Sequence, residues 1–219
     1  MQVRLFYLTL RSDAPIPHRP ERVRGYLATQ FNEYSLLHQH IEGDRFRYRY
    51  PLVQYRVLDN AAVVIGINEG ADVLKEIYRE TDSLRLGSER YRIVERSIGV
   101  EDAPFGLATE IVSYRFVTPW IALNQKNYTD FAILSETDRH DRLRGILVGN
   151  ILSASKGLEY QVPDQIRLEI GPMTTRTCSL KGIPVIGFMG SFTTNFTIPD
   201  LLGLGKSVSR GYGAVRQLR

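Results

Sequence analysis

Hydrophobic residues in this chain switch between the two-residue spacing of a strand and the three- to four-residue spacing of a helix. The order of these segments restricts the fold. In the first half we expect strands at 2–10, 45–58 and 61–68, a strand or hairpin at 84–100, and helices at 20–37 and 70–80. The order strand, helix, strand, strand, helix, strand is the split βαβ order of a ferredoxin-like domain.

The second half of the chain repeats this order after a proline- and glycine-containing boundary at 103–106. We expect a strand at 110–123, a helix at 140–158, a hairpin formed by 166–180 and 183–194, a short helix at 198–204 and a strand at 208–215. The apolar side of the long helix is predicted to carry Leu143, Ile146, Leu147, Ile151 and Leu152. The sequence thus predicts an α+β protein of two tandem ferredoxin-like (RRM-like) domains, at 1–103 and 104–219.

Composition restricts the class of protein further. Hydrophobic residues make up 43% of the chain, which is enough for a packed core. The chain contains no run of about 18 apolar residues, so we expect no membrane span. Arg4 interrupts the apolar N-terminal segment, which also lacks a signal-peptide cleavage site. Cys178 is the only cysteine, so it has no partner for an intramolecular disulfide. We therefore expect a cytoplasmic protein with no membrane association.

The positive charge of the chain comes mainly from arginine. The net charge is +4, and only five of the 28 basic residues are lysine. Arginine presents a planar set of donors that matches phosphate, and it stacks on bases. This bias favours a nucleic-acid partner, although a genome that prefers arginine codons produces the same bias.

A glycine-rich, basic stretch lies near the C-terminal end of the sequence. Glycines in such a loop permit left-handed backbone and close approach, and the N–H groups of the loop suit phosphate oxygens. We therefore predict RNA-phosphate binding here, although a tight helix-to-strand connection explains the same glycines. The predicted RNA-binding residues of this loop are Gly203, Gly205, Lys206, Ser207, Arg210, Gly211 and Gly213.

The same stretch contains a Gly-Lys-Ser sequence at 205–207, which also ends the P-loop of ATPases. The P-loop motif requires a glycine where this chain has Asp200, and no α/β domain follows the stretch. These two departures exclude the ATPase interpretation.

Two histidines, His38 and His40, follow the first predicted helix. A helix C-terminus stabilises imidazolium, and histidine titrates near neutral pH. A pair of this kind is able to move the protons in metal-free RNA cleavage. Two alternatives remain: a metal pair, for which the sequence offers no third ligand nearby, and ordinary surface histidines at a helix end.

Arginine and aromatic residues alternate in the predicted strand that follows the histidines. In an extended strand one face carries the arginines and the other the aromatics. The arginine face is suited to phosphates and the aromatic face to stacked bases, while an edge strand protected by charge explains the pattern equally. The predicted RNA-binding residues are Arg45, Arg47 and Arg49, opposite Phe46, Tyr48 and Tyr50.

Two parts of the chain together resemble a known family. The first is the segment 187–190 with the glycine-rich stretch 203–213, and the second runs from 50–55 to 65–70. With these motifs the chain resembles the CRISPR-associated repeat-processing endoribonucleases called Cas six, and in particular their b subtype. The tandem ferredoxin-like architecture of that family agrees with the strand and helix order above.

The resemblance implies an endoribonuclease that cuts precursor CRISPR RNA within its repeats without a metal ion or other cofactor. The ribose 2′-OH attacks the adjacent phosphate and leaves a 2′,3′-cyclic phosphate. By the same resemblance His38 and His40 serve as general acid and base, and Tyr48 or Tyr50 helps to position the phosphate. The family often supplies a lysine near the site. This chain has no lysine before Lys75, so Arg47 or Arg49 is expected in its place.

Two further expectations concern partners. The alternative function is a module that binds repeat RNA without cutting it, or a subunit of an RNA-guided CRISPR effector complex. A homodimer is also expected, because the first predicted helix carries apolar aromatic residues such as Tyr26 and Tyr34.

Overall fold

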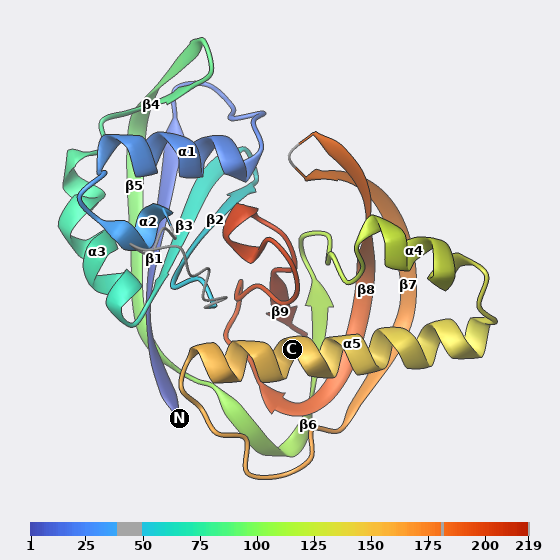
Figure 1. Cartoon of the computed structure of the whole chain (residues 1–219). Helices are drawn as coiled ribbons and strands as arrows, with labels where there is room; N and C mark the ends of the chain where they lie inside the picture. The colour runs from blue at the N-terminus through green and yellow to red at the C-terminus, as the bar shows by residue number, and fades with distance from the viewer. Residues whose placement is uncertain (39–49, 181, 219) are drawn as a thin grey trace. The chain divides into compact units, whose positions relative to one another are not determined.

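The computed structural model of the protein describes residues 1–38, 50–180 and 182–218 (Figure 1). The chain divides into two compact units. The N-terminal unit contains Gln2–Ala103 together with Ser209–Gly211, and the C-terminal unit contains Met1, Pro104–Val208 and Tyr212–Arg219. Across the described residues, no helix combines the length and the apolar character that a membrane crossing requires.

The N-terminal unit is a five-stranded sheet in the order β2-β3-β1-β5-β4. Without the edge strand β4, which forms a hairpin with β5, this is the strand order of a ferredoxin-like domain. Its elements are β1 (Gln2–Ser12), α1 (Pro20–Gln30), α2 (Ser35–His38), β2 (Val53–Leu58), β3 (Ala61–Ile67), α3 (Glu69–Ile77), the 3₁₀ helix η1 (Tyr78–Glu80), β4 (Ser83–Leu86) and β5 (Glu89–Pro104).

The core of this unit forms where α1 and α3 cover one face of the sheet (Figure 1). Side chains of strand β1 alternate, and every second one points to these helices. The helices contribute residues at the three- and four-residue spacing that the sequence predicted. Core residues from these three elements are Phe6, Leu8 and Leu10 of β1, Val23 and Leu27 of α1, and Leu74 and Ile77 of α3.

Two glycines explain the tight connection between β3 and α3. A Cβ atom on Gly66 would overlap the backbone of Gly70, and a Cβ atom on Gly70 would overlap the carbonyl of Leu52. Between them Asn68 adopts a φ of 50°, and its side-chain oxygen accepts a hydrogen bond of 3.0 Å from the N–H of Arg4. The glycines are therefore required by packing in this segment.

The predicted helix at 20–37 is wrong in one respect, because it is interrupted. Helix α1 ends at Gln30, where Phe31 leaves helical geometry at φ −122° and ψ 59° and its side chain enters the core. A separate short helix, α2, then carries the chain to His38. The predicted strand at 45–58 begins at Val53 within the described residues, and positions 45–49 lie outside them.

The C-terminal unit has a four-stranded sheet in the order β7-β8-β6-β9, again a ferredoxin-like order. The predicted fold class, α+β with two tandem ferredoxin-like domains, is therefore confirmed. Helix α5 lies across this sheet (Figure 1). The elements are β6 (Gly106–Phe116), α4 (Gln125–Ala132), α5 (Glu136–Gly157), β7 (Leu168–Leu180), β8 (Ile183–Thr197) and β9 (Val215–Gln217), and the 3₁₀ helix η2 spans Val208–Arg210.

Helix α5 follows the predicted amphipathic pattern with one exception. Its N-terminus is capped by the Ser135 hydroxyl, which accepts a 3.2 Å hydrogen bond from the N–H of Asp138. Leu143, Leu147 and Ile151 are buried as expected, but Leu152 is 45% exposed. The prediction is wrong for Leu152, since that residue lies at the margin of the apolar stripe, next to buried Ile151 but on the solvent side.

The end of the chain differs from the sequence prediction. Residues 198–204 form no helix, and the predicted strand at 208–215 is replaced by the short β9. The reason is the hydrogen bonding of the backbone: the Leu201 N–H donates to the Val215 carbonyl at 2.7 Å, and the Leu204 N–H donates to the Gly213 carbonyl at 2.9 Å. Because these donors cross to a neighbouring segment, they are not available for helical hydrogen bonds.

Candidate active site

His38 is the last residue of α2, and two side chains hold that end of the helix. The guanidinium of Arg24 donates a hydrogen bond to the carbonyl oxygen of His38, and the hydroxyl of Tyr55 donates to the carbonyl of Leu37 at 3.4 Å. The last carbonyls of a helix lack partners within the helix, and a cation there also interacts favourably with the helix dipole. The end of α2, and with it His38, is therefore held by side-chain contacts to the helix backbone.

Arg24 is half-buried, and its surroundings are positive. Burial lowers the pKa of the Arg24 guanidinium, and the positive charge of Arg210 lowers that pKa further, while Tyr55 opposes both. The Nε atom of Arg24 is buried and has no hydrogen-bond partner in the described part of the chain.

Arg210 comes from the glycine-rich stretch, and Gly211 makes its position possible. Gly211 has a φ of 100°, and a Cβ atom there would overlap the ring of Pro20 and lie 3.3 Å from the carbonyl oxygen of Tyr55. The segment Ser209–Gly211 therefore packs against the start of α1 and against β2, within the N-terminal unit.

Strand β2 brings a second arginine into the interior of the same unit. Arg56 is fully buried, and it donates hydrogen bonds to the carbonyl of Tyr55 at 2.8 Å and to the side-chain oxygen of Gln54 at 2.7 Å. Burial lowers the pKa of Arg56 to about 10, and Tyr50 opposes this shift. Arg56 therefore stays charged at neutral pH, and Tyr50, a predicted site residue, lies within its electrostatic range.

The structure describes some of the predicted site residues and not others. His38 and Tyr50 are described, and both are half-buried. The predicted residues outside the described part of the chain are His40, Arg45, Arg47, Tyr48 and Arg49. Arg24 and Tyr55 were missed by sequence reasoning. One feature of the sequence could have indicated Arg24: its positive charge lies beside the apolar stripe of the first helix, directly after the buried Val23.

The glycine-rich residues of the C-terminal unit serve close packing. A Cβ atom on Gly205, which has a φ of 90°, would lie 2.7 Å from the indole nitrogen of Trp120, and one on Gly213 would overlap the Leu204 carbonyl. The N–H of Lys206 donates to the Ile121 carbonyl at 3.2 Å, and the N–H of Gly213 donates to the Pro119 carbonyl at 2.9 Å. Gly203 forms an isolated bridge with Ala214. The N–H groups of Lys206 and Gly213 are thus used within the protein, while the side chains of Lys206, Ser207 and Arg210 are partly exposed. Phosphate binding by this stretch stays a prediction.

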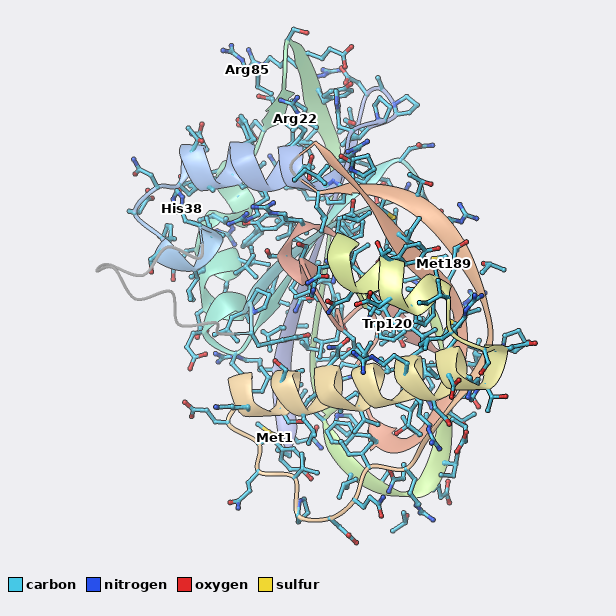
Figure 2. All side chains as sticks on the ribbon, turned by 45° about the vertical axis from the view of Figure 1, so that its right-hand side comes forward. Met1, Arg22, His38, Arg85, Trp120 and Met189 are labelled. Atoms are coloured by element: carbon cyan, nitrogen blue, oxygen red, sulfur yellow. The ribbon has the colours of Figure 1, made fainter. Side chains whose placement is uncertain are left out.

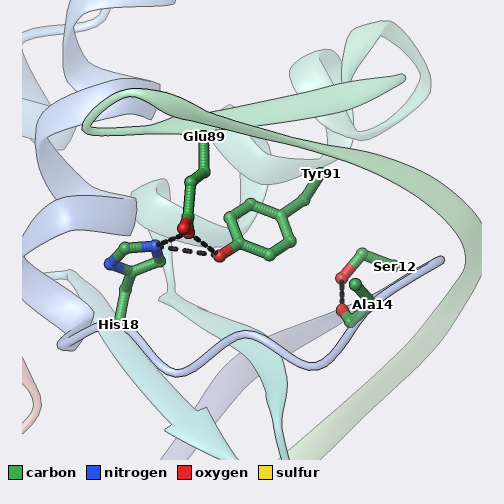
Figure 3. Close-up of polar contacts among 5 residues, drawn as sticks. All are labelled: Ser12, Ala14, His18, Glu89 and Tyr91. Atoms are coloured by element: carbon green, nitrogen blue, oxygen red, sulfur yellow. Dashed lines mark hydrogen bonds and ion pairs between the residues drawn. The ribbon is translucent and has the colours of Figure 1, made fainter.

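A second cluster of titratable groups lies just before α1 (Figure 3). The Nε2 atom of His18 lies 2.9 Å from a carboxylate oxygen of Glu89 and 3.0 Å from the hydroxyl of Tyr91, and this hydroxyl also donates to Glu89. The hydrogen bond to Glu89, together with burial and the negative charge of Glu89, raises the pKa of Tyr91 to about 12. Hydrogen bonds from Tyr91 and His18 lower the pKa of Glu89. The cluster ties the loop before α1 to the β4–β5 hairpin.

No group of three or more histidine, cysteine, aspartate or glutamate side chains lies close enough to bind a metal ion in the part of the chain that the structure describes. The remaining described histidine, His140, is engaged in the C-terminal unit, where its Nε2 atom lies 2.8 Å from the Ile170 carbonyl oxygen.

Comparison with known proteins identifies a family over nearly the whole chain. The family model of the Cas6b N-terminal domain matches residues 1–103, and that of the Cas6b C-terminal domain matches residues 106–218. An uncharacterised protein of Methanocaldococcus jannaschii is 41% identical over 140 residues, which are 64% of this chain and 95% of that protein.

Solved structures agree with these matches. A crystal structure of Cas6b has a TM-score of 0.92 at 31% identity, and a crystal structure of the CRISPR RNA processing endoribonuclease Cas6b has a TM-score of 0.78 at 30% identity. Both comparisons cover 100% of each chain. Because the two family models together span nearly all of the sequence, and the resemblance read from its motifs is thereby confirmed, the chain belongs to the Cas6b family of CRISPR-associated proteins.

Proposed function

We propose that this protein is an endoribonuclease that cuts precursor CRISPR RNA within its repeats without a metal ion. The observation that carries the proposal is His38, anchored by Arg24 at the end of α2 in a chain that both Cas6b family models match. The Cas6b relative named as a CRISPR RNA processing endoribonuclease supports the same activity.

The proposed reaction is an internal transesterification. The ribose 2′ oxygen forms a bond to the adjacent phosphorus, and the bond from phosphorus to the 5′ oxygen of the next nucleotide breaks. A base takes the proton of the 2′-OH, and an acid gives a proton to the leaving 5′ oxygen. The products are an RNA that ends in a 2′,3′-cyclic phosphate and an RNA that begins with a 5′-OH.

Histidine suits both proton transfers, because its neutral and charged forms are both populated near neutral pH. We assign the two transfers to His38 and His40. Tyr48 and Tyr50 are proposed to position the phosphate, and Arg45, Arg47 and Arg49 to bind the RNA backbone. For Tyr50 the electrostatic range of the buried Arg56 supports this role, since that charge favours an anion nearby.

We further propose that the two halves of the sequence have different roles. Residues 1–103 carry the histidines, and residues 104–219 carry the glycine-rich stretch, whose basic and hydroxyl side chains bind RNA phosphates. Lys206, Ser207 and Arg210 are the candidates, because each is partly exposed.

The test is cleavage of the CRISPR repeat RNA from the same genome in the presence of EDTA. The wild-type protein is expected to cut at one position, and the His38→Ala and His40→Ala variants are expected to cut at least about 100-fold more slowly. His18→Ala is the matched control, because that histidine is engaged with Glu89 and Tyr91. A requirement for a divalent ion, or full activity of the double histidine variant, would overturn the mechanism. Intact RNA bound without a product would instead identify a binding module.

A further inference from the structure

Arg24 and Arg210 differ from four other arginines of the N-terminal unit in their electrostatic surroundings. In the described part of the chain those four pair with carboxylates: Arg4 with Asp72, Arg11 with Glu95, Arg92 with Asp13 and Arg96 with Asp82. Within the same described residues, neither Arg24 nor Arg210 has an acidic side chain within ion-pair distance. Their charges are therefore not neutralised by this part of the protein.

Backbone packing brings the two arginines to one place. Pro20 and Arg24 are four residues apart on α1, so they lie on the same face of that helix. Gly211 packs against the ring of Pro20 and against the backbone of Tyr55, and Arg210 directly precedes it. Tyr55 in turn reaches the end of α2 through its hydroxyl. The guanidinium groups of Arg24 and Arg210 therefore lie within electrostatic range of each other, and that of Arg24 also contacts the carbonyl oxygen of His38.

Two like charges that are partly removed from water repel each other, and each destabilises the charged form of the other. Burial is the main cause of the lowered pKa of Arg24, and the positive charge of Arg210 lowers that pKa further, as this repulsion requires. An anion bound between the two guanidinium groups would offset the repulsion between their charges. Guanidinium groups bind phosphate through parallel N–H donors, which makes a phosphodiester the anion that suits the pair.

We propose that Arg24 and Arg210 jointly bind a single phosphate of the RNA. This phosphate is the one at which the RNA is cut, beside His38. This inference rests on the proposed function, which supplies the RNA and the cut. Arg24 has a second effect as a positioning residue, since it also holds the His38 backbone. The glycine-rich stretch then contributes to the cleavage site itself, through Arg210, as well as to RNA binding.

The salt dependence of RNA binding tests this proposal. The probe is the repeat RNA with 2′-deoxyribose at the mapped cut, which keeps the RNA intact during the measurement. For single strands, the slope of log affinity against log salt concentration becomes shallower by about 0.7 for each phosphate that the protein no longer binds. We expect the double variant Arg24→Met/Arg210→Met to reduce the slope by about 0.7, the value for one shared phosphate. A reduction of about 1.4, the value for two phosphates, or no reduction, would contradict the shared site.

Arg22→Met is the matched control. Arg22 is an exposed residue of the same helix (Figure 2). Residues two apart on a helix point about 200° away from each other, so Arg22 does not share the face of Arg24. Its variant is expected to keep the wild-type salt slope and the wild-type cleavage rate. The lysine variants Arg24→Lys and Arg210→Lys keep the charge and are expected to keep most of the slope, which separates loss of phosphate binding from misfolding.

Single-turnover cleavage of unmodified repeat RNA gives the second readout. With RNA at saturating concentration, Arg24→Met and Arg210→Met are each expected to slow the cut by about 100-fold, as loss of one group that stabilises transition-state charge does. Wild-type cleavage by the double variant would refute the proposal while leaving the role of His38 intact. If the wild-type protein makes no cut, the proposed function fails, and salt slopes measured on unmodified RNA still decide whether the two arginines share a phosphate.

Discussion

Arg24 donates a hydrogen bond to the backbone carbonyl of His38, so a side chain of α1 holds the end of α2. The helix α2 has only four residues, which is too short to be stable without such support. The position of the candidate catalytic histidine therefore depends on contacts from outside its own helix. Substitution of the residues that make these contacts tests this dependence.

The hydroxyl of Tyr55 is the second of these contacts. We predict that Tyr55→Phe lowers the free energy of unfolding of the N-terminal unit by about 1 kcal/mol, because the Leu37 carbonyl loses a buried hydrogen bond. Urea denaturation of the full chain measures this change. Tyr26→Phe on α1 is the control, since no hydrogen bond of the Tyr26 hydroxyl is found among the described residues. An equal loss in both variants would contradict the role given to Tyr55.

Gly211 is predicted to tolerate no side chain. Gly211→Ala places a methyl group against Pro20 in a left-handed backbone conformation, so we expect it to destabilise the protein and to displace Arg210. The comparison is Gly87→Ala, where φ is 74° and no atom lies within 4 Å of the added carbon. Gly87→Ala isolates the conformational cost, which is about 1 kcal/mol.

Thermal unfolding and RNA affinity of the two alanine variants give the result. We expect Gly211→Ala to lose both stability and affinity, and Gly87→Ala to lose stability alone. Equal RNA affinity in the two variants would show that Gly211 does not position an RNA-binding side chain.

The cluster of His18, Glu89 and Tyr91 predicts a specific pH dependence. The pKa of Tyr91 is raised to about 12 in the folded protein, so the neutral phenol is favoured by folding. Its contribution to stability is fully present below the ordinary phenol pKa of about 10 and is lost as the pH rises towards 12. The pKa of Glu89 is lowered, so its contribution is lost in acid, as the pH falls through the folded-state value.

Glu89→Gln tests this cluster by a spectroscopic titration. Ultraviolet absorbance of tyrosinate is expected to show the Tyr91 transition at lower pH in the variant than in the wild type, because the carboxylate that opposes ionisation is gone. Glu21→Gln on α1 is the control and leaves the transition unchanged. A Tyr91 transition that stays in place in Glu89→Gln would mean that burial alone raises the pKa.

The sequence alone was sufficient for the fold class and insufficient for the site. Hydrophobic spacing is a local property, so strands such as β1 and β3 and the long helix α5 followed from it. The interruption at Phe31 did not, because Phe31 fits the helical spacing and leaves the helix to fill the core. Likewise the backbone of 198–204 bonds to residues that are distant in sequence, such as Val215.

The candidate site was likewise only partly predictable from local sequence patterns. His38 was predicted because it stands near the end of the first helical pattern, and the structure places it as the last residue of α2. Arg24 and Tyr55 were not, since their importance comes from contacts to α2 that no spacing reveals. Phosphate binding by Gly211 stays a prediction, and the structure adds a packing constraint that the sequence did not reveal, since a Cβ atom there would overlap the ring of Pro20.

The chemistry of the RNA ends tests the central claim most directly. Wild-type protein is incubated with repeat RNA in EDTA, and the mass of the upstream fragment is measured. We predict a 2′,3′-cyclic phosphate, which is lighter than a linear phosphate by one water, and no such fragment from an RNA with 2′-deoxyribose at the cut. An upstream fragment that ends in a free 3′-OH, or a cut that persists in the deoxyribose substrate, would contradict attack by the 2′-OH.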